Sequence, residues 1–417
     1  MRFCKKCLYP ENAKPALLID ETGICSGCRY HEDVGKHVDW NKRRSMWREL
    51  VEEIKDTSKV NKSNHDVLIP VSGGKDSFYQ VFTALEYGLN PLLVSYNHCF
   101  NTSAGNSNLA RLVESSGCDH IRYTIGFRTA QRLSSYMMHK CGDLTWHYHA
   151  GIYSLPSQVA AQFNISFVLW GEHGFQNLLG MFDANNIVEF TNWSRSEHSM
   201  RGITIEDLES AGISSRDTWL FEYPSNTKIA KLGLRGVYLS SYFPWKPKEQ
   251  TVKVAIPNGF QGVRFRRDRT PNLYSKIEDH ANDVHDYLKY LKFGYGRATD
   301  DLSQEIREFR ISREEAKKIV KHYDPVEPRS LPYYCKFLGL TLDEFYEIAF
   351  RMQDKDAMDG KIRKSLVEDS PSDSKDSALV KDYIFNDSNR NLYFNPNNIP
   401  VASGDSSFNM PGEMKVL

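Results

Sequence analysis

Two groups of residues in this sequence have types and spacings that support chemistry. The first is the run Ser72-Gly73-Gly74-Lys75-Asp76-Ser77. Glycines let a backbone adopt positive φ and approach an anion closely, and serine hydroxyls and a lysine ammonium bind phosphate oxygens. The second group is a set of four cysteines near the N-terminus, Cys4, Cys7, Cys25 and Cys28. We therefore expect a phosphate-binding loop and a metal site.

The four cysteines form two pairs, Cys4-x-x-Cys7 and Cys25-x-x-Cys28, separated by the 17 residues 8–24. This spacing is typical of four-cysteine zinc sites. Four thiolates complete the tetrahedral shell of Zn²⁺, so we expect a structural zinc knuckle over residues 1–35. The alternative is a redox-active pair. We disfavour it because we expect neither pair to open a helix in a thioredoxin-like unit.

The glycine-rich run lies between a predicted strand and a predicted helix. Four short apolar runs predict buried strands, at residues 66–71, 91–96, 120–125 and 165–170. Helical spacing of apolar residues follows the first two of these runs, at Phe78–Leu85 and Leu109–Val113. This alternation predicts an α/β fold with a parallel sheet and helices on both faces. The run 72–77 would then lie where open α/β sheets bind ligands.

The loop differs from the common P-loop, G-x-x-x-x-G-K-[ST], because Ile69 stands where a glycine is required and Asp76 where Ser or Thr is required. It resembles the SGG-x-DS motif of the PP-loop ATP pyrophosphatases. That resemblance implies an adenine nucleotide alpha hydrolase-like fold, with ATP and Mg²⁺ bound and ATP split into AMP and pyrophosphate. A glycine-rich turn that binds no ligand is the simpler alternative.

The same resemblance implies roles for residues at three strand ends. Lys75 and Asp76 would act on the phosphates and the magnesium ion, although Asp76 could equally cap the helix. Tyr96 and Asn97 would contact the adenosine. Gly171 would allow close approach to ribose or phosphate, and Glu172 would bind metal or orient a nucleophile.

Further stretches narrow the resemblance. They are Trp146-His147-Tyr148-His149-Ala150-Gly151-Ile152-Tyr153, then Trp170-Gly171-Glu172, then the stretch from Tyr290 to Asp300. With the cysteine pairs, they make residues 1–350 similar to the N-acetyl sugar amidotransferases of bacterial surface polysaccharide (lipopolysaccharide, O-antigen) and flagellar sugar synthesis. The resemblance implies that ammonia converts the acetamido group of a nucleotide-activated sugar into an acetamidino group through an adenylated intermediate.

The resemblance also suggests substrate contacts. His147 and His149 would lie on one face if their segment were extended, where they would recognise the sugar or transfer protons. Trp146 and His173 are further candidates for substrate binding. Arg297 and Asp300 would bind nucleotide phosphate and sugar hydroxyls. The alternatives are hydrogen-bonded histidines in an aromatic core and a helix-end ion pair between Arg297 and Asp300.

Ammonia requires a source, and a glutaminase would need an activated cysteine nucleophile. The remaining cysteines have no convincing nucleophile context; they are Cys99, Cys118, Cys141 and Cys335. The family implies two separate partners, a glutaminase subunit and a cyclase-like subunit, which deliver ammonia through a channel.

Composition limits the other possibilities. The 417 residues contain no apolar run of membrane-spanning length, and no apolar segment follows Met1, so we expect a cytoplasmic protein without membrane contact. Lys+Arg and Asp+Glu both number 53, so no global field attracts nucleic acid, although Arg264, Arg266, Arg267 and Arg269 could form a local basic patch.

The expected organisation begins with the zinc knuckle at 1–35 and a linker helix at 36–60, with apolar spacing over Trp40–Lys55. A PP-loop domain with substrate-binding insertions covers 61–300, and a helix runs over 277–291. C-terminal helices at 301–358 contain capping boxes at Ser312 and Thr341, and a polar, flexible tail covers 359–417.

Two other functions fit parts of the sequence. A tRNA-thiolating PP-loop enzyme can also carry zinc knuckles, but it would need a persulfide or cluster-binding set of cysteines and a basic RNA surface. A non-catalytic zinc-knuckle binding protein is the more distant alternative, because it leaves an intact loop without a role.

Overall fold

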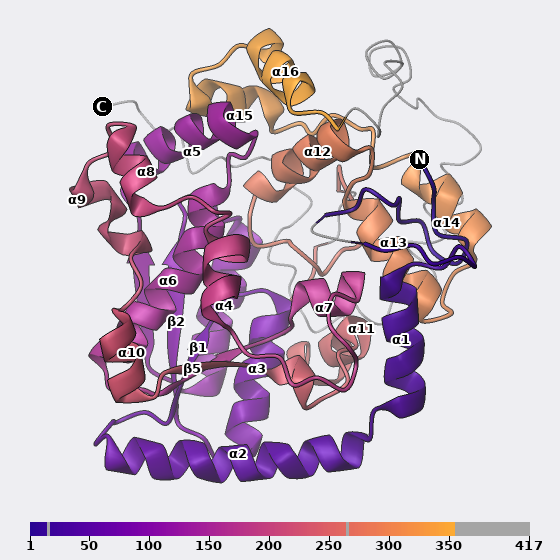
Figure 1. Cartoon of the computed structure of the whole chain (residues 1–417). Coiled ribbons are helices and arrows are strands. Elements are labelled where there is room, and N and C mark those ends of the chain that lie inside the picture. The colour runs from indigo at the N-terminus through magenta and orange to yellow at the C-terminus, as the bar shows by residue number, and fades with distance from the viewer. Residues whose placement is uncertain (15–16, 264–266, 355–417) are drawn as a thin grey trace.

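The core of the computed structural model, which describes residues 1–14, 17–263 and 267–354, is a parallel sheet of five strands. Their order is β3-β2-β1-β4-β5 (Figure 1). The strands are β1 Val67–Pro70, β2 Pro91–Asn97, β3 His120–Thr124, β4 Phe167–Trp170 and β5 Arg235–Tyr238. The four strands predicted from the sequence are confirmed. The fifth, a short segment containing Gly236, was not predicted.

The sheet is buried on both faces because its central strands are almost wholly apolar. Leu68 of β1 pairs with Leu92 of β2 on one side and with Val168 of β4 on the other. Alternate residues along β1 enter two separate cores, with Leu68 in one and Ile69 in the other. Such continuous burial is what a parallel sheet requires, and the predicted fold class is confirmed.

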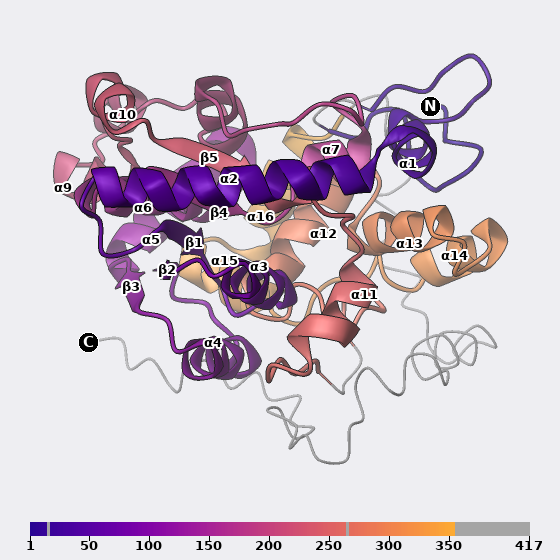
Figure 2. The same ribbon diagram turned by 90° about the horizontal axis from the view of Figure 1, so that it is seen from below.

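Helices cover both faces. On the Ile69 face lie α2 Trp40–Val60, α3 Lys75–Glu86 and α4 Ser103–Ser116; on the Leu68 face lie α5 Phe127–Cys141 and α6 Trp146–Gln162. Helix α2 runs along the lower side of the molecule (Figures 1 and 2) and packs Trp47 and Ile54 inward. It confirms the helix expected over Trp40–Lys55 and extends it to Val60.

Where the sequence predicts substrate-binding insertions, residues 174–255 form mainly short elements around β5. They are α7 Gly174–Leu179, η1 Ser194–Ser199, α8 Ile205–Ser210, α9 Ser215–Thr218, η2 Trp219–Phe221, α10 Asn226–Leu232, η3 Leu239–Ser241, α11 Pro247–Gln250 and η4 Thr251–Ala255. Residues 187–190 run beside β5, where the amide of Phe190 donates to the carbonyl of Gly236 at 2.7 Å.

The N-terminal cysteine segment and α1 Ser26–His37 lie beside helices from the other end of the chain (Figure 2). These neighbours are α13 Arg297–Arg307 and α14 Arg313–Val320. The other helices of this end of the chain are α12 Ala281–Phe293, α15 Leu331–Leu338 and α16 Leu342–Arg351. The capping boxes predicted at Ser312 and Thr341 are confirmed. The helix expected from Ile277 begins at Ala281 instead. The tail predicted at 359–417 lies outside the described residues.

The strand order reverses between β1 and β4. The chain runs from β1 outward through β2 and β3, then crosses to β4 and β5 on the other side of β1. The loops that follow β1 and β4 therefore separate at the carboxyl edge of the sheet. This topological switch point is where open α/β sheets leave a crevice for a ligand.

Candidate functional site

The loop 72–77 follows β1 at this switch point and is shaped to expose backbone amides. Gly73 has φ of 83°, and a Cβ there would lie 2.6 Å from the carbonyl oxygen of Gly105. Gly74 begins α3 without any side-chain cap. The hydroxyl of Ser77 accepts from the amide of Ser72 at 3.0 Å, which closes the loop on itself. The uncapped first turn of this helix is suited to an anion.

A lysine and two carboxylates surround the loop. Lys75 is buried, with Nζ 2.6–2.7 Å from both carboxylate oxygens of Asp76. Burial lowers the pKa of Lys75, but Asp76, Glu172 and Glu278 outweigh it and raise that pKa above its usual value. Lys75 is therefore an ammonium ion at neutral pH.

Glu172 follows β4 across the crevice. Burial raises the pKa of its carboxyl group, and the neighbouring charge of Asp76 adds to this effect. Its Oε2 accepts from Nδ2 of Asn177 at 3.3 Å. The structure thus brings together Lys75, Asp76 and Glu172, which the sequence placed at two different strand ends.

A third carboxylate, Glu278, was missed from the sequence. A Cβ on Gly74 would lie 3.3 Å from its Oε1, and its buried Oε2 has no hydrogen-bond partner in the described part of the chain. An orphaned carboxylate oxygen beside Gly74 and near Lys75 fits a hard cation such as Mg²⁺, which prefers oxygen ligands. No spacing in the sequence indicates Glu278, because more than 200 residues separate it from the loop.

The two residues expected to contact adenosine are engaged within the protein. Tyr96 is 8% exposed, and its hydroxyl is 2.9 Å from Nδ1 of His147. The amide of Asn97 donates to Thr124 at 2.9 Å and accepts from the backbone of Cys99 at 3.1 Å. Position 171 requires a small residue even without a ligand, because a Cβ there would lie 3.1 Å from the side chain of Gln80.

The segment that carries His147 and His149 is helical, so the extended arrangement considered for it is wrong. Residues two apart on a helix point about 200° apart, and the two rings lie in different surroundings. His147 is fully buried and bonds to Tyr96. His149 lies with its ring centroid 5.5 Å from that of His285.

Neither histidine is charged at neutral pH. Burial, with a smaller contribution from His98, lowers the pKa of His147 well below its usual range. Burial, followed by the charges of Arg201 and His285, lowers the pKa of His149 to about 3. Nδ1 of His149 and Nε2 of His147 are buried without a hydrogen-bond partner among the described residues. Each ring therefore has a polar atom left to bond.

The side chains of Trp146 and His173 are buried and form hydrogen bonds to other atoms of the protein. Trp146 is fully buried, and its Nε1 donates to the carbonyl of Met200 at 2.8 Å. His173 is 3% exposed and caps α7, with Nδ1 accepting from the amide of Gln176 at 3.2 Å. Both have the structural roles that hydrogen-bonded residues in an aromatic core would have.

Arg297 and Asp300 form the ion pair that was the alternative to substrate binding. Arg297 donates two bonds of 2.9 Å to the carboxylate of Asp286 and lies 3.3 Å from Asp300. Asp300 also accepts from Lys289 at 2.5 Å and from the hydroxyl of Tyr9 at 2.9 Å. This buried network joins α12 and α13 to the N-terminal segment.

The basic patch considered at 264–269 is not supported where the structure describes it. Arg267 and Arg269 are buried and donate to backbone carbonyls, among them those of Asn272 and Tyr323. Arg264 and Arg266 lie outside the described residues.

The four predicted metal ligands form one cluster. All four cysteines are fully buried, and their sulfur atoms lie within 4.8 Å of one another. The pair Cys4–Cys28 is 4.0 Å apart and the pair Cys7–Cys25 is 3.6 Å apart. Four sulfurs bound tetrahedrally to zinc at about 2.3 Å would be about 3.8 Å apart, so the cluster fits Zn²⁺.

The second cysteine pair lies at the start of a helix, although not in a thioredoxin-like unit. Cys25 is the N-cap of α1, and its sulfur accepts from the amide of Cys28, so this pair does open a helix. The helix does not follow a strand of the sheet, and the close approach of all four sulfurs still favours a metal.

A buried arginine that the sequence did not indicate lies against the cluster. The guanidinium of Arg307 is 3.4 Å from the sulfur of Cys28, 3.6 Å from that of Cys25 and 3.8 Å from that of Cys7. It also donates to the carbonyl of Leu178 at 2.7 Å. Four thiolates around Zn²⁺ carry a net charge of about −2, which one buried cation partly offsets.

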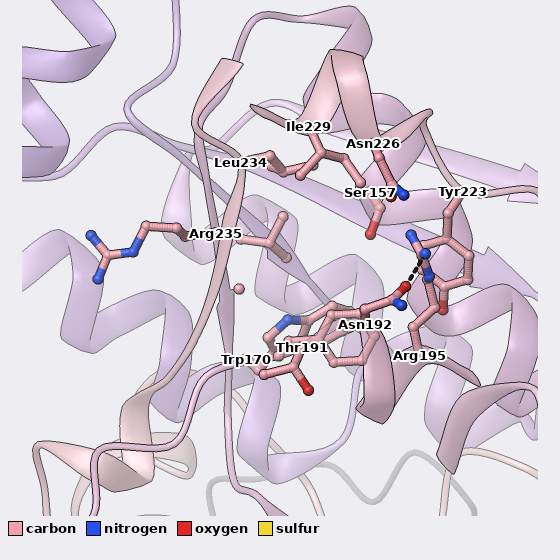
Figure 3. Close-up of a pocket in the computed structure, with 13 residues that line it drawn as sticks. Ser157, Trp170, Thr191, Asn192, Arg195, Tyr223, Asn226, Ile229, Leu234 and Arg235 are labelled. Carbon is pink, nitrogen blue, oxygen red and sulfur yellow. Dashed lines mark hydrogen bonds between the residues drawn. The ribbon is translucent and has the colours of Figure 1, made fainter. Parts of the chain in front are cut away.

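A separate cavity of about 140 Å³ lies between α6, α10 and the β4–β5 edge (Figure 3). Trp170 and Phe190 line it with Ile229 and Leu234 opposite, and the side chain of Arg235 points away from it. Nε1 of Trp170 has no hydrogen-bond partner among the described residues, because it faces Gly236.

The fold and the site define a parallel α/β protein with a glycine-rich, charged loop at its switch point and a four-cysteine cluster. Residues 264–361 match the family described as "LPS biosynthesis protein WbpG-like, C-terminal domain". The expected similarity to proteins of surface polysaccharide synthesis is thus confirmed for this part of the chain. A comparison with curated proteins found no match.

Solved structures show weaker likenesses. An NMN synthetase from Francisella tularensis is 14% identical with a TM-score of 0.26, over 47% of this chain and 91% of that one. An NH3-dependent NAD synthetase from Campylobacter jejuni is 18% identical, also with a TM-score of 0.26, over 47% and 92%. A predicted subunit of tRNA methyltransferase from Methanocaldococcus jannaschii is 16% identical with a TM-score of 0.22, over 43% and 93%. The fold class stated above depends on the strand order and register.

Among the helices of the described segments, none has both the length and the apolar character that a membrane crossing requires.

Proposed function

We propose that this protein is an AMP-forming amidotransferase that converts the acetamido group of a nucleotide-activated sugar into an acetamidino group. The observation that carries the proposal is the meeting of Lys75, Asp76 and Glu172 at the switch point, beside an uncapped helix start. The match of residues 264–361 to a lipopolysaccharide biosynthesis family supports a sugar substrate.

The chemistry makes two demands. The acetamido oxygen attacks the α-phosphorus of ATP and displaces pyrophosphate, which gives an O-adenylated imidate. Ammonia then adds to the imidate carbon, the C–O bond breaks, and AMP leaves with the bonding electrons. The loop amides and the Lys75 ammonium would stabilise negative charge on the phosphates during the first step.

Mg²⁺, when bound, would neutralise phosphate charge, and the carboxylates that fit it are Asp76, Glu172 and Glu278. The two histidines would have a different task. A group with a pKa of about 3, such as His149, is a weak base, so hydrogen bonding to the sugar suits it better than proton transfer.

Ammonia would come from a separate glutaminase subunit together with a cyclase-like subunit. The state of the other cysteines supports this part of the proposal. Burial raises the pKa of the Cys99, Cys118 and Cys141 thiols, and that of Cys335 to about 11. A thiol with a raised pKa is a poor nucleophile at neutral pH.

The test is an assay with ATP, Mg²⁺, ammonium and a panel of acetamido-bearing nucleotide sugars. The expected result is sugar-dependent AMP and pyrophosphate release, with a product about one mass unit lighter as NH replaces O. AMP release stimulated by tRNA without any sugar would instead support a thiolating enzyme. No turnover with ammonium or with a glutaminase partner would overturn the proposal.

A further inference from the structure

The short helix α7 follows directly on Glu172 and rests on the four-cysteine unit, defined here as residues 1–37. In both views α7 lies beside α1 (Figures 1 and 2). The hydroxyl of Ser26, next to the ligand Cys25, donates to the carbonyl of Leu179 at 2.6 Å. Arg307 bonds to the neighbouring carbonyl of Leu178 while it contacts three of the cysteine sulfurs.

Two glycines make this contact as close as backbones allow. A Cβ on Gly27 would overlap the carbonyl oxygen of Leu178, and a Cβ on Gly180 would overlap the carbonyl of Ser26. Gly180 also has φ of 66°, which ends α7. With no side chain between them, a shift of α1 must move α7.

A chain of two hydrogen bonds continues from this contact to Glu172. The hydroxyl of Tyr30, on α1, is 3.3 Å from Oδ1 of Asn177, on α7. Nδ2 of Asn177 donates to Oε2 of Glu172 at 3.3 Å. When the tyrosine hydroxyl donates to Oδ1, the amide nitrogen is left facing the carboxylate. Tyr30 therefore selects the orientation of the amide that Glu172 requires.

We propose that Tyr30 and Asn177 are positioning residues through which the four-cysteine unit orients the Glu172 carboxylate. The proposal takes the ATP site of the proposed function as given. It means that the four-cysteine cluster influences the orientation of Glu172 without contacting the substrate.

Several charged or titratable groups face Glu172: Lys75 and Asp76 from the loop, Lys276 from the segment before α12, Tyr153 from α6 and Tyr30 from α1. Among them, Lys75, Lys276 and the Asn177 hydrogen bond lower the pKa of Glu172, against the larger effects of burial and Asp76. The hydrogen bond from Asn177 fixes one oxygen of this carboxylate. Loss of the Asn177 donor should leave the orientation of the Glu172 carboxylate unfixed, which lowers kcat more than it changes KM.

The experiment uses the full chain with Tyr30→Phe, Asn177→Ala and the double variant. We expect Asn177→Ala to lower kcat about tenfold, with a smaller change in KM for ATP. Tyr30→Phe should lower kcat in the same way but by less. The double variant should be no worse than Asn177→Ala, because Tyr30 acts only through Asn177.

Tyr9→Phe is the matched control. It removes another hydroxyl of the four-cysteine unit, but that hydroxyl bonds to Asp300 and is not connected to Glu172. Its kcat should stay where the parent has it, and all variants should keep their zinc by elemental analysis. An unchanged kcat in Asn177→Ala, or additive effects in the double variant, would overturn the proposal.

Hydrogen–deuterium exchange of the peptide covering 171–180 gives a readout that requires no turnover. Exchange there should rise in Tyr30→Phe and on zinc chelation, and stay unchanged in Tyr9→Phe. If the parent makes no AMP with any sugar, the proposed function fails. The exchange measurement still tests whether Tyr30 and Asn177 connect the four-cysteine unit to Glu172. Unchanged exchange in Tyr30→Phe would refute the link itself.

Discussion

At the scale of single residues, the crevice holds like charges close together. After burial, the charge of Asp76 is the next largest cause that raises the pKa of Glu172, and the buried Lys75 ammonium offsets part of that effect. Asp76 has a side chain that is 39% exposed, so it contributes little to the core. Packing of the core does not require a charge at this position. The role of Asp76 is therefore in binding.

Asp76→Asn tests this assignment. The change keeps the shape and removes the charge, so AMP formation should fall by about 100-fold or more, since magnesium and Lys75 both lose their partner. The midpoint of thermal unfolding should fall by less than about 5 °C, because Glu172 and Glu278 still compensate the charge of the buried Lys75.

Asp56→Asn is the control for Asp76→Asn. Asp56 also pairs with a lysine, Lys59 at 3.0 Å, but on the exposed surface of α2. It should leave AMP formation unchanged. Equal activity in the two variants would remove Asp76 from the mechanism.

At the scale of elements, close approach of backbones positions the site. Helix α6 contains Gly151 in its first half, where a Cβ would lie 2.6 Å from the ring of Tyr96. The glycine lets β2 and α6 approach until the Tyr96 hydroxyl reaches His147. A helix normally loses stability at a glycine, so here the contact with Tyr96 outweighs helix propensity.

Gly151→Ala should therefore destabilise the protein, by about 1–3 kcal/mol, because Tyr96 must move. Gly35→Ala, in α1, should do the opposite and stabilise by about 0.5–1 kcal/mol, since nothing lies within 4 Å of the added Cβ. Urea unfolding of both variants measures the difference. Stabilisation by both substitutions would show that the Tyr96 ring yields without cost.

The elements predicted from sequence were those with strong local patterns. The strand at 67–70 and the capping boxes at Ser312 and Thr341 depend on neighbouring residues, so local propensity sufficed. Strand β5 was not predicted because its first two residues, Arg235 and Gly236, interrupt an apolar run; Gly236 is a small residue required by the indole of Trp170. The segment forms a strand because it pairs with β4.

The candidate site divides in the same way. Loop 72–77 and the four cysteines are contiguous or regularly spaced, so their chemistry is visible in the sequence. Glu278 and Arg307 reach their places only through tertiary folding, and no period or motif marks them. The spacing of His147 and His149 does not by itself predict whether their side chains meet. Residues two apart lie on one face of a strand but on opposite faces of a helix.

At the scale of the whole molecule, the four-cysteine unit joins distant parts of the chain. Tyr9 bonds to Asp300, Arg313 donates to the carbonyls of Cys4 and Cys7 at 3.0 Å, and Arg307 contacts the sulfurs. Loss of the metal would leave the buried thiolates to repel one another, and once they are protonated the Arg307 charge would stay buried without compensation; both outcomes are costly.

Elemental analysis should find one zinc per chain, and chelation should lower the unfolding midpoint by at least about 5 °C. Cys28→Ala should lose the metal. Cys118→Ala, which removes a thiol outside the cluster, should keep it. A chain that holds no metal, or chelation without effect on stability, would contradict the assignment of the cluster as a structural site.

The long reach of the four-cysteine unit also sets an order of events during synthesis. The ligand cysteines are made first, but Arg307 and Arg313 follow 279 to 309 residues later. At about 5–20 residues per second, roughly 15–60 s pass before these partners exist. During that time the thiols are exposed to metal, oxidants and chaperones. The nascent knuckle is therefore at its most vulnerable before the arginines that cover it have been translated.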